Sequence, residues 1–384
     1  MQWHIITGEY PPQRGGVGDY TYLLADGLAR VGEEVHVWAP AASADVSRSA
    51  AVKVHALPNH FGVRWLLALH RGLSAEGKDG TVLVQYVPHL FGWKAMNLAF
   101  CLWMALHRNK KNIWVMFHEV AYPFRTGQPL KHDFLAVVHR IMAWIVLRSA
   151  SRSFTSIEPY KQLLNKLAPK AQVELLRLFS NVPFNQPGIS DFKRSQSSDA
   201  RPLVGIFSSF GKNIWDLLDE TLPDLLKDSR FDLLFVGPGA QFIRHFSRKY
   251  PAFKHRFWTT GRLNALDAGP YIQGCDLLLQ LYPEGACGAR GTFTAALASG
   301  VPVITTAGPL TEPLFKDAVA FTEMKPHEIR RTIEELLADK VAARSLGAAS
   351  RQLYEENFDL SVALAALTGD SAIALAECAM ARSA

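Results

Sequence analysis

The chain has 384 residues, of which 48% are hydrophobic and 20% are charged. One hydrophobic core seldom serves a chain of this length, so we expect two domains. The 41 Lys and Arg residues exceed the 35 Asp and Glu residues, an imbalance that suits phosphorylated ligands or an anionic membrane surface. No long run of Lys and Arg occurs, and the totals therefore argue against a nucleic-acid-binding protein.

The cysteines and the N-terminus indicate a cytoplasmic protein. Cys101, Cys275, Cys287 and Cys378 show no C-x-x-C spacing, so they predict neither a zinc site nor a disulfide framework. Free thiols fit a reducing compartment. The first seven residues lack the basic and apolar regions of a secretory signal and are typical of a strand.

In the first half, short apolar runs alternate with segments of helical periodicity, which is the pattern of a parallel sheet covered by helices on both faces. Helices are expected to begin near Asp19, Val63, Trp93 and Lys131. The predicted strands are residues 3–7, 34–39, 52–57, 81–87, 112–118 and 153–156.

Residues 180–201 are rich in Pro, Gly, Ser and charged residues and lack apolar periodicity, which predicts an interdomain linker. A second βα series follows, with helices over residues 241–250 and 326–338. Its predicted strands are residues 202–209, 231–237, 256–261, 276–282, 301–305 and 318–322.

The predicted organisation is an N-terminal acceptor-side domain over residues 1–185 and a C-terminal nucleotide-binding domain over residues 186–358. A last helix over residues 359–384 is expected to pack back on the first domain. Doubly wound domains of this kind bind ligands outside the carboxyl ends of their strands.

Residues 95–106 are almost entirely apolar, but they are interrupted by Asn97 and are shorter than the ~20 residues that span a bilayer. A helix packed on the sheet is the favoured interpretation. The alternative is a weak contact of residues 93–111 with the inner face of a membrane, because a basic cluster follows at residues 107–111.

A glycine-rich loop follows the first predicted strand and opens a helix, as a ligand-binding loop would. Residues 16–21 begin like a dinucleotide-binding fingerprint but place Thr21 where the third glycine belongs. The second strand also ends without the acidic residue that binds a ribose. Both departures argue against a dinucleotide cofactor, and we expect Gly16 and Gly18 to allow close approach of a sugar or acceptor.

The same loop resembles that of another family. Residues 10–20, Tyr-Pro-Pro-Gln-Arg-Gly-Gly-Val-Gly-Asp-Tyr, are similar to the P-P-x-x-G-G-x-G/E loop of the large retaining family of GT-B glycosyltransferases, the glycosyl transferases group 1. Residues 34–37 match the next strand of that family, and residues 114–119 match a strand that ends in a histidine. The resemblance implies an α/β GT-B fold, in which two doubly wound Rossmann-like domains face each other across a cleft.

The resemblance continues in the second half, with one departure. Residues 295–306, Ala-Ala-Leu-Ala-Ser-Gly-Val-Pro-Val-Ile-Thr-Thr, are very similar to the family's E-A-M-A-A-G-x-P-V-h-A-T. The family carries two glutamates separated by seven residues, and those positions hold Cys287 and Ala295 here. The missing second glutamate usually binds the ribose, so its loss affects nucleotide selectivity.

The segment Arg290-Gly291-Thr292 resembles a divergent branch of the family with R-G-T/S at the helix start. Arg290 supplies a fork of N–H donors suited to a diphosphate. Gly291 and Thr292 open a predicted helix whose first N–H groups attract anionic oxygens.

The resemblance implies further donor-binding residues. Lys212, after Gly211, would neutralise the departing diphosphate, and a surface lysine on a polar turn is the alternative. Arg262 occupies a similar place after a later strand. Glu284 would face the transferred sugar, unless it is a solvated loop residue, and Glu312 would meet the ribose.

His118 is the histidine that we expect to hydrogen-bond the donor sugar, as the resemblance implies. The alternative is a core histidine held by the backbone. Asp19 would orient the acceptor or, in an inverting enzyme, act as a general base. A partner of the helix dipole is the alternative for Asp19.

The resemblance thus implies a hexosyltransferase-type glycosyltransferase that moves a sugar from a nucleoside diphosphate sugar to a sugar or lipid-linked acceptor. The resemblance implies retention of configuration, no metal ion and no cofactor besides the donor substrate. Two alternatives stay open: a GT-B nucleotide-sugar epimerase or hydrolase, and a degenerate, non-catalytic GT-B binding module.

Overall fold

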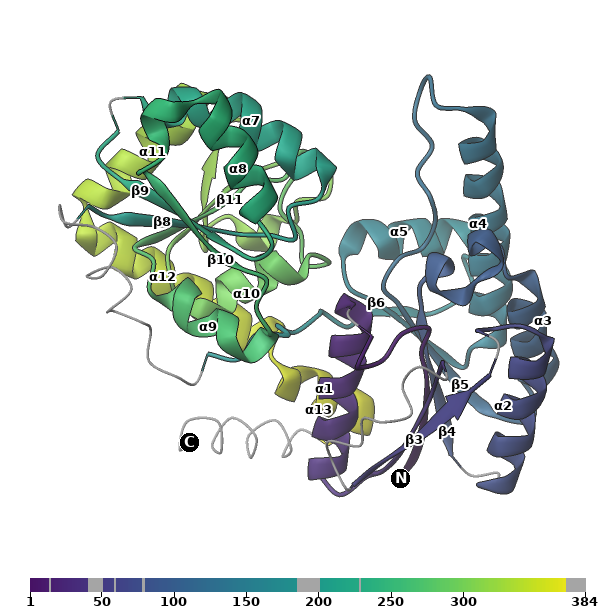
Figure 1. The fold of residues 1–384 in the computed structure, drawn as a ribbon. Helices are drawn as coiled ribbons and strands as arrows, with labels where there is room; N and C mark the ends of the chain where they lie inside the picture. The colour runs from purple at the N-terminus through teal and green to yellow at the C-terminus, as the bar shows by residue number, and fades with distance from the viewer. Residues whose placement is uncertain are drawn as a thin grey trace. The chain divides into compact units, whose positions relative to one another are not determined.

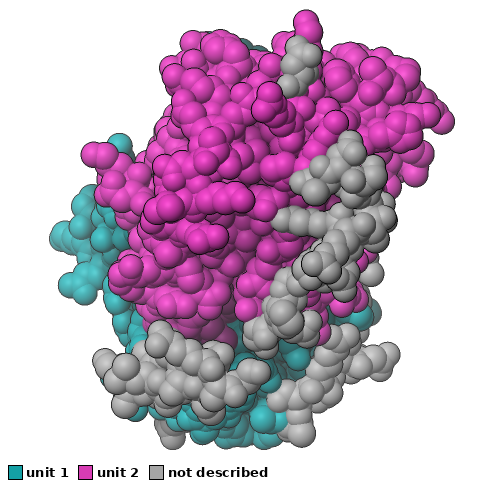
Figure 2. Space-filling model, turned by 90° about the vertical axis from the view of Figure 1, so that its left-hand side faces the viewer, with its two compact units in different colours: residues 1–177, 363–376 teal, residues 178–362, 377–384 magenta. Residues whose placement is uncertain are grey.

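The computed structural model describes residues 1–13, 15–40, 51–58, 60–77, 80–184, 201–227 and 229–370. The chain forms two compact units, which are coloured separately in Figure 2. The first comprises residues 1–177 and resumes at Ala363, and the second comprises residues 178–362. Most of the predicted linker and the end of the predicted last helix lie outside the described residues.

The first unit is a seven-stranded sheet in which all paired strands are parallel, with the order β3-β2-β1-β4-β5-β6-β7 (Figure 1). The buried side chains of α2, α3 and α4 share one core against this sheet. Its elements are β1 (Gln2–Ile6), α1 (Gly16–Arg30), β2 (Glu34–Pro40), β3 (Val52–Leu57), α2 (Val63–Ala75), β4 (Thr81–Tyr86), η2 (Pro88–Phe91), η3 (Trp93–Ala95), α3 (Leu98–His107), β5 (Asn112–Phe117), α4 (Leu130–Ser149), β6 (Arg152–Thr155), α5 (Glu158–Leu167) and β7 (Val173–Leu175).

The second unit is a six-stranded parallel sheet with the order β10-β9-β8-β11-β12-β13. One core holds side chains of α9, α10 and α12, and another holds those of α7, α8 and α11. Its elements are β8 (Leu203–Phe207), α7 (Lys212–Leu226), β9 (Asp232–Val236), α8 (Ala240–Lys249), η4 (Pro251–Phe253), β10 (Phe257–Gly261), α9 (Ala265–Gln273), β11 (Leu277–Gln280), α10 (Gly291–Ser299), β12 (Val303–Thr306), η5 (Pro313–Phe315), β13 (Ala320–Thr322), α11 (Pro326–Ala338) and α12 (Lys340–Asn357), and α13 (Leu360–Thr368) leads back to the first unit.

The predicted α/β class with two doubly wound sheets is confirmed. Each predicted strand overlaps an observed one, and β7 is the strand that was not predicted, because three residues are too few to show a periodicity.

The helix predicted to begin near Trp93 begins at Leu98 instead. Trp93, Lys94 and Ala95 have positive φ values of 51°, 53° and 67°, which an α-helix cannot contain. Asn97 then caps α3, because its Oδ1 accepts a hydrogen bond from Phe100 N at 2.9 Å. The residue that interrupts the apolar run is therefore the one that starts the helix.

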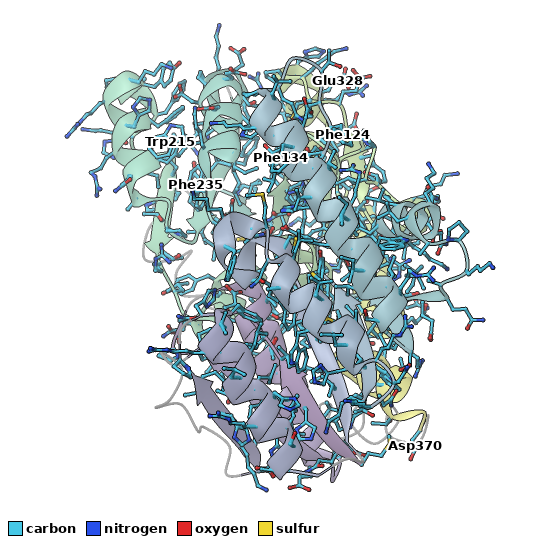
Figure 3. The ribbon with its side chains drawn as sticks, turned by 90° about the vertical axis from the view of Figure 1, so that its right-hand side faces the viewer. Phe124, Phe134, Trp215, Phe235, Glu328 and Asp370 are labelled. Atoms are coloured by element: carbon cyan, nitrogen blue, oxygen red, sulfur yellow. The ribbon has the colours of Figure 1, made fainter. Side chains whose placement is uncertain are left out.

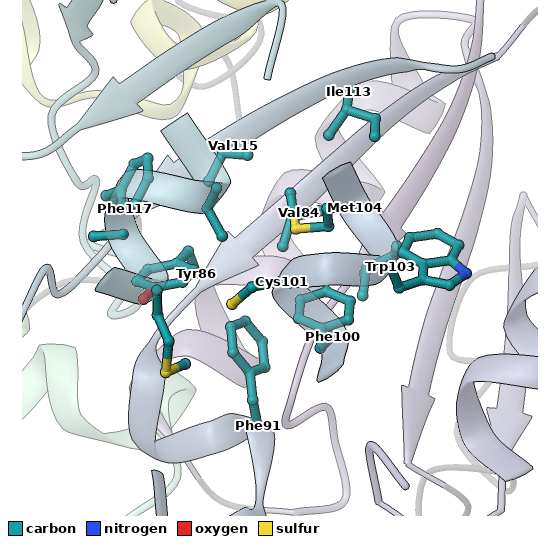
Figure 4. Close-up of a cluster of buried hydrophobic side chains, with 14 of the residues drawn as sticks. Val84, Tyr86, Phe91, Phe100, Cys101, Trp103, Met104, Ile113, Val115 and Phe117 are labelled. Carbon is teal, nitrogen blue, oxygen red and sulfur yellow. The ribbon is translucent and has the colours of Figure 1, made fainter. Parts of the chain in front are cut away.

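The predicted packing of residues 95–106 on the sheet is confirmed. Phe100, Cys101 and Met104 on the inner face of α3 are fully buried in one cluster with strand residues such as Val84 and Val115 (Figure 4). Among the described helices, none is long and apolar enough to cross a membrane.

Candidate functional site

The strand order of the second unit places two predicted loops beside each other. β8 and β11 are hydrogen-bonded neighbours, and the sheet continues from β8 to β9 on one side and from β11 to β12 on the other. Open α/β sheets bind ligands outside the carboxyl ends of the strands at such a switch point. The loop after β8 leads to Lys212, and the loop after β11 leads to Arg290.

Both loops end at an uncapped helix N-terminus. The N-cap of α7 is Gly211, which has no side chain. The N-cap of α10 is Arg290, whose side chain makes no capping hydrogen bond. A Cβ added to Gly211 or to Gly291 would meet no atom within 4 Å among the described parts of the chain. The first N–H groups of both helices therefore have open space beside them, which is the arrangement that attracts phosphate oxygens.

Tyr282 organises the Arg290-Gly291-Thr292 segment. Its hydroxyl lies 2.8 Å from Thr292 Oγ1, and the Arg290 guanidinium carbon lies 4.7 Å from the centre of its ring. Burial raises the pKa of the Tyr282 phenol, so the hydroxyl stays protonated and can donate. The aromatic ring thus orients the guanidinium through a cation–π contact.

Each of the two cations at the switch point lies beside a carboxylate. Lys212 Nζ lies 2.7 Å from Asp216 Oδ2, and 84% of the lysine side chain is exposed. Arg290 Nη2 lies 3.4 Å from Glu284 Oε2, and about half of the glutamate side chain is exposed. Exposed ion pairs are weak, so neither carboxylate competes strongly with an anionic ligand for its cation. Arg262 is also exposed, directly after β10.

The positions of the two family glutamates are buried. Cys287 is 2% exposed, and Ala295 is fully buried in the core around α10. A carboxylate at Ala295 would therefore lie among apolar side chains, at a high desolvation cost. Burial first, and the charge of Glu312 as a smaller cause, raise the pKa of the Cys287 thiol. The buried carboxyl of Glu312 is thus near the place where the first family glutamate would stand.

The loop after β12 brings Glu312 there because it packs tightly on the loop after β11. Gly285 has a φ of 88°, and a Cβ added to it would lie 2.4 Å from Gly308 N. Leu310 N donates to Glu284 O at 3.2 Å. The two loops are therefore packed directly against each other, and glycine is required at position 285, where they touch.

In the first unit, a glutamate of the glycine-rich loop, Glu9, binds the N-terminus of the helix that follows the loop. The sequence analysis assigned no role to this residue. Glu9 Oε1 accepts hydrogen bonds from Val17 N at 2.9 Å and from Gly18 N at 3.0 Å. A Cβ added to Gly15 would collide with the Glu9 carboxylate, whereas one added to Gly16 would meet open space. The N-terminus of α1 already holds an anion, which argues against a phosphate at this loop.

Asp19 lies in the first turn of α1 and is partly buried. Burial first, and then the charge of Glu9, raise the pKa of its carboxyl. A carboxyl with a raised pKa is closer to the range of a general base or of a hydrogen-bond donor to a sugar hydroxyl.

His118 directly follows β5 and is 6% exposed. Its Nε2 lies 2.6 Å from Gln85 Oε1, and Tyr20 packs edge-on at a ring distance of 5.0 Å. Burial lowers the pKa of His118 to about 4, so the ring is neutral at physiological pH. With the Gln85 amide in this orientation, Nε2 carries the proton.

One group in the described residues has the composition of a metal site: His36, His55 and Glu76. His36 Nδ1 lies 2.9 Å from His55 Nε2, which is the distance of a hydrogen bond between the two rings. His36 Nε2 lies 3.2 Å from Glu34 Oε1. These contacts satisfy both nitrogens of His36 without an ion.

Residues 201–339 match the family model described as Glycosyl transferases group 1. No curated protein matches the chain in sequence.

Solved structures are similar over nearly the whole chain. Sucrose-phosphate synthase from Thermosynechococcus elongatus has a TM-score of 0.73 and 15% identity, and the match covers 100% of this chain and 98% of that one. Anabaena HepE, solved with UDP and glucose, has a TM-score of 0.66 and 15% identity over 96% and 98%. WaaG, a glycosyltransferase involved in lipopolysaccharide biosynthesis, has a TM-score of 0.66 and 17% identity over 96% and 100%.

These neighbours share the GT-B fold with this chain. Residues 201–339 are thus similar to the Glycosyl transferases group 1 family, and the chain as a whole has an α/β GT-B fold of two Rossmann-like sheets.

Proposed function

We propose that the protein transfers a hexose from a nucleoside diphosphate sugar to a sugar or lipid-linked acceptor, with retention of configuration and without a metal ion. The observation that carries the proposal is the pair of uncapped helix N-termini at Gly211 and Arg290, which follow adjacent strands at the switch point of the second sheet. Each brings a cation, Lys212 or Arg290, to the same edge.

The proposed step breaks the bond between the sugar C1 and the oxygen of the β-phosphate, and the electron pair of that bond goes to the phosphate. Negative charge therefore develops on the diphosphate, where Lys212, Arg290 and the N–H groups at Gly291 and Thr292 stabilise it. The acceptor hydroxyl attacks C1 from the side of the leaving group, and the phosphate oxygen takes its proton.

Two carboxylates are assigned to the donor. Glu312 is buried and close enough to Cys287 for its charge to help raise the pKa of that thiol, so it brings a carboxylate from the next loop to the segment that lacks the family glutamates. We assign it to the ribose. Glu284 is the carboxylate for the transferred sugar, and its contact with Arg290 at 3.4 Å places it beside the arginine that we assign to the diphosphate.

The first unit supplies the remaining proposed roles. His118 is held neutral with an oriented ring, as a hydrogen-bond partner of the transferred sugar would be. Asp19 has a raised pKa and can orient an acceptor hydroxyl. Gly16 has open space beside its Cα, so the loop can lie close to a substrate there.

UDP is the first nucleotide to test, because the HepE structures hold UDP or UDP-glucose. Thermal unfolding with UDP, GDP, ADP and TDP identifies the base, and radiolabelled sugars on that nucleotide identify the sugar through slow hydrolysis of the donor. We expect one diphosphate to raise the unfolding temperature, and Lys212→Ala to reduce donor hydrolysis with an unchanged unfolding temperature of the free protein. Asp216→Asn is the matched control, since it frees Lys212 without removing its charge.

Two outcomes would contradict the proposal. Hydrolysis by Lys212→Ala equal to that of the wild type would remove Lys212 from the mechanism. Absence of binding by all four diphosphates in calorimetry would favour a non-catalytic binding module.

A further inference from the structure

The outer faces of α3 and α4 are apolar although they are exposed. On α4 the exposed large side chains recur every three or four residues: Leu130, Phe134, Val137, Ile141 and Trp144, with exposed fractions of 44–86%. On α3 they are Leu98, Leu102 and Leu106. Helices that cover the sheet of a globular protein normally carry polar residues on this side. We call the two stripes together the α3–α4 face.

The two stripes belong to neighbouring helices. α3 and α4 pack against each other, and their inner sides, with residues such as Met104 and Met142, are already buried in the core. The outer stripes therefore leave much of their apolar surface exposed to solvent. Figure 3 looks onto this side of the molecule, where Phe124 and Phe134 carry labels. The stripe from Leu130 to Trp144 covers 15 of the 20 residues of α4 and is about 22 Å long, so the α3–α4 face is a large apolar surface.

The positive charge of the whole chain is concentrated on the segment that forms this face. Residues 93–149 contain eight Lys and Arg against two acidic residues, Glu119 and Asp133. Of the chain's 41 basic and 35 acidic residues, 33 of each lie outside residues 93–149, so this segment carries the whole excess of positive charge. The basic residues include Lys94, Arg108 and Lys131, all exposed.

Two arginines lie over aromatic rings within this segment. The Arg140 guanidinium carbon is 4.2 Å from the centre of the Phe124 ring, and that of Arg148 is 5.4 Å from the Trp144 ring. Val137, Ile141 and Trp144 also line a shallow hollow of about 280 Å³ together with Arg140 and Leu167. Apolar rings and chains beside cationic groups match the boundary between acyl chains and anionic headgroups.

We propose that the α3–α4 face binds the surface of an anionic lipid bilayer, with the apolar stripes at the level of the acyl chains and the basic residues at the headgroups. The positive charge of residues 93–149 favours a lipid surface over a protein partner. A segment with an excess of lysines and arginines is attracted to anionic lipid, whereas lysine, which supplies four of the eight basic residues here, is depleted from protein–protein interfaces. Exposed tryptophans, here Trp93 and Trp144, are also typical of a membrane interface.

The test is co-sedimentation of the full chain with vesicles of phosphatidylcholine alone and of phosphatidylcholine with phosphatidylglycerol, at low and at high salt. We expect binding to the anionic vesicles that weakens with salt. The double change Phe134→Ser and Ile141→Ser, and the double change Arg108→Glu and Lys110→Glu, should each weaken this binding by at least about tenfold. Because these side chains are exposed, thermal unfolding should stay as in the wild type.

Matched controls lie on the second unit. Leu266→Ser with Val341→Ser removes two apolar side chains that are at least as exposed, and Lys340→Glu with Arg344→Glu reverses two exposed charges. These variants should bind vesicles like the wild type. Equal binding to neutral and anionic vesicles, or no effect of the Arg108 and Lys110 changes, would overturn the proposal.

The proposal would also be overturned if the wild type failed to sediment with either vesicle. A dimer without lipid that Phe134→Ser and Ile141→Ser converts to a monomer would show that a second copy of the chain covers the face. The assay contains no donor and no acceptor, so its result is independent of the proposed sugar transfer.

Discussion

The guanidinium of Arg290 lies over the ring of Tyr282, at 4.7 Å from the ring centre, and the hydroxyl of the same tyrosine lies 2.8 Å from Thr292. One buried aromatic side chain thereby sets the position of both functional side chains of the R-G-T segment. The cation is oriented at the start of α10 before any ligand arrives. Preorganised groups of this kind are the most effective in stabilising charge that develops during a reaction.

Arg290→Lys should therefore fail to replace arginine. A lysine keeps the charge but lacks the planar fork that stacks on Tyr282 and grips two phosphate oxygens. We expect kcat/KM for donor hydrolysis to fall roughly 10²-fold in both Arg290→Lys and Arg290→Ala. Arg344→Lys, at an exposed position on α12, is the control. Near-normal rates in Arg290→Lys would mean that charge alone is needed.

Gly291→Ala separates a ligand-binding role from a structural one. The added Cβ meets no described atom within 4 Å, and alanine favours a helix over glycine by up to about 1 kcal/mol. The free protein should therefore be as stable as the wild type or more so. Nucleoside diphosphate affinity, measured by calorimetry, should fall, because the methyl group fills space beside the first N–H groups of α10. Unchanged affinity would place the diphosphate elsewhere.

Glu9→Ala should destabilise the protein as loss of a helix cap does. Val17 and Gly18 lose their acceptor, at a cost of about 1 kcal/mol in the free energy of unfolding. Asp339 is a matched cap on the second unit, since its Oδ1 accepts from Val341 N and Ala342 N. Asp339→Ala should cost a similar amount in urea denaturation.

The two caps should differ in their effect on Asp19. The charge of Glu9 helps to raise the pKa of Asp19, so Glu9→Gln should lower that pKa in a carboxyl NMR titration, whereas Asp339→Asn should not. Because the pKa of Asp19 is raised in the folded state, its ionisation opposes folding. An Asp19 pKa that does not move in Glu9→Gln would leave burial as its whole cause.

His118 should make stability depend on pH. Its pKa is about 4 in the folded protein against 6.5 for an ordinary histidine, so only the unfolded state binds a proton between these values. Stability from this group is therefore present above pH 6.5 and is lost as the pH falls through that interval. Between pH 7 and pH 5 the loss is about 2 kcal/mol.

The measurement is urea unfolding of the full chain at both pH values. His118→Asn should lose about 2 kcal/mol less than the wild type over this interval. His327→Asn, which replaces a histidine that is 74% exposed, is the control. Equal pH dependence in His118→Asn and the wild type would contradict a buried, neutral His118.

The sequence by itself determined the fold class and the loops that carry the candidate donor site. Apolar periodicity is a local property, and in a parallel sheet the loops that follow adjacent strands end at the same edge, so Lys212 and Arg290 could be placed there from their distance to a predicted strand. The family motif around Arg290 is also a local property, so it could be recognised from consecutive residues of the sequence.

Only the tertiary structure decided which groups meet across these loops. Glu9 turns back onto the N-terminus of α1, and Glu312 approaches Cys287 from a loop 25 residues away. Neither contact produces a periodic pattern in the sequence from which it could be predicted. The outward stripe of α4 was missed because apolar residues occur on several sides of that helix. Which side is buried depends on the helices and strands packed against it, and Phe134 and Ile141 are exposed because no described element covers them.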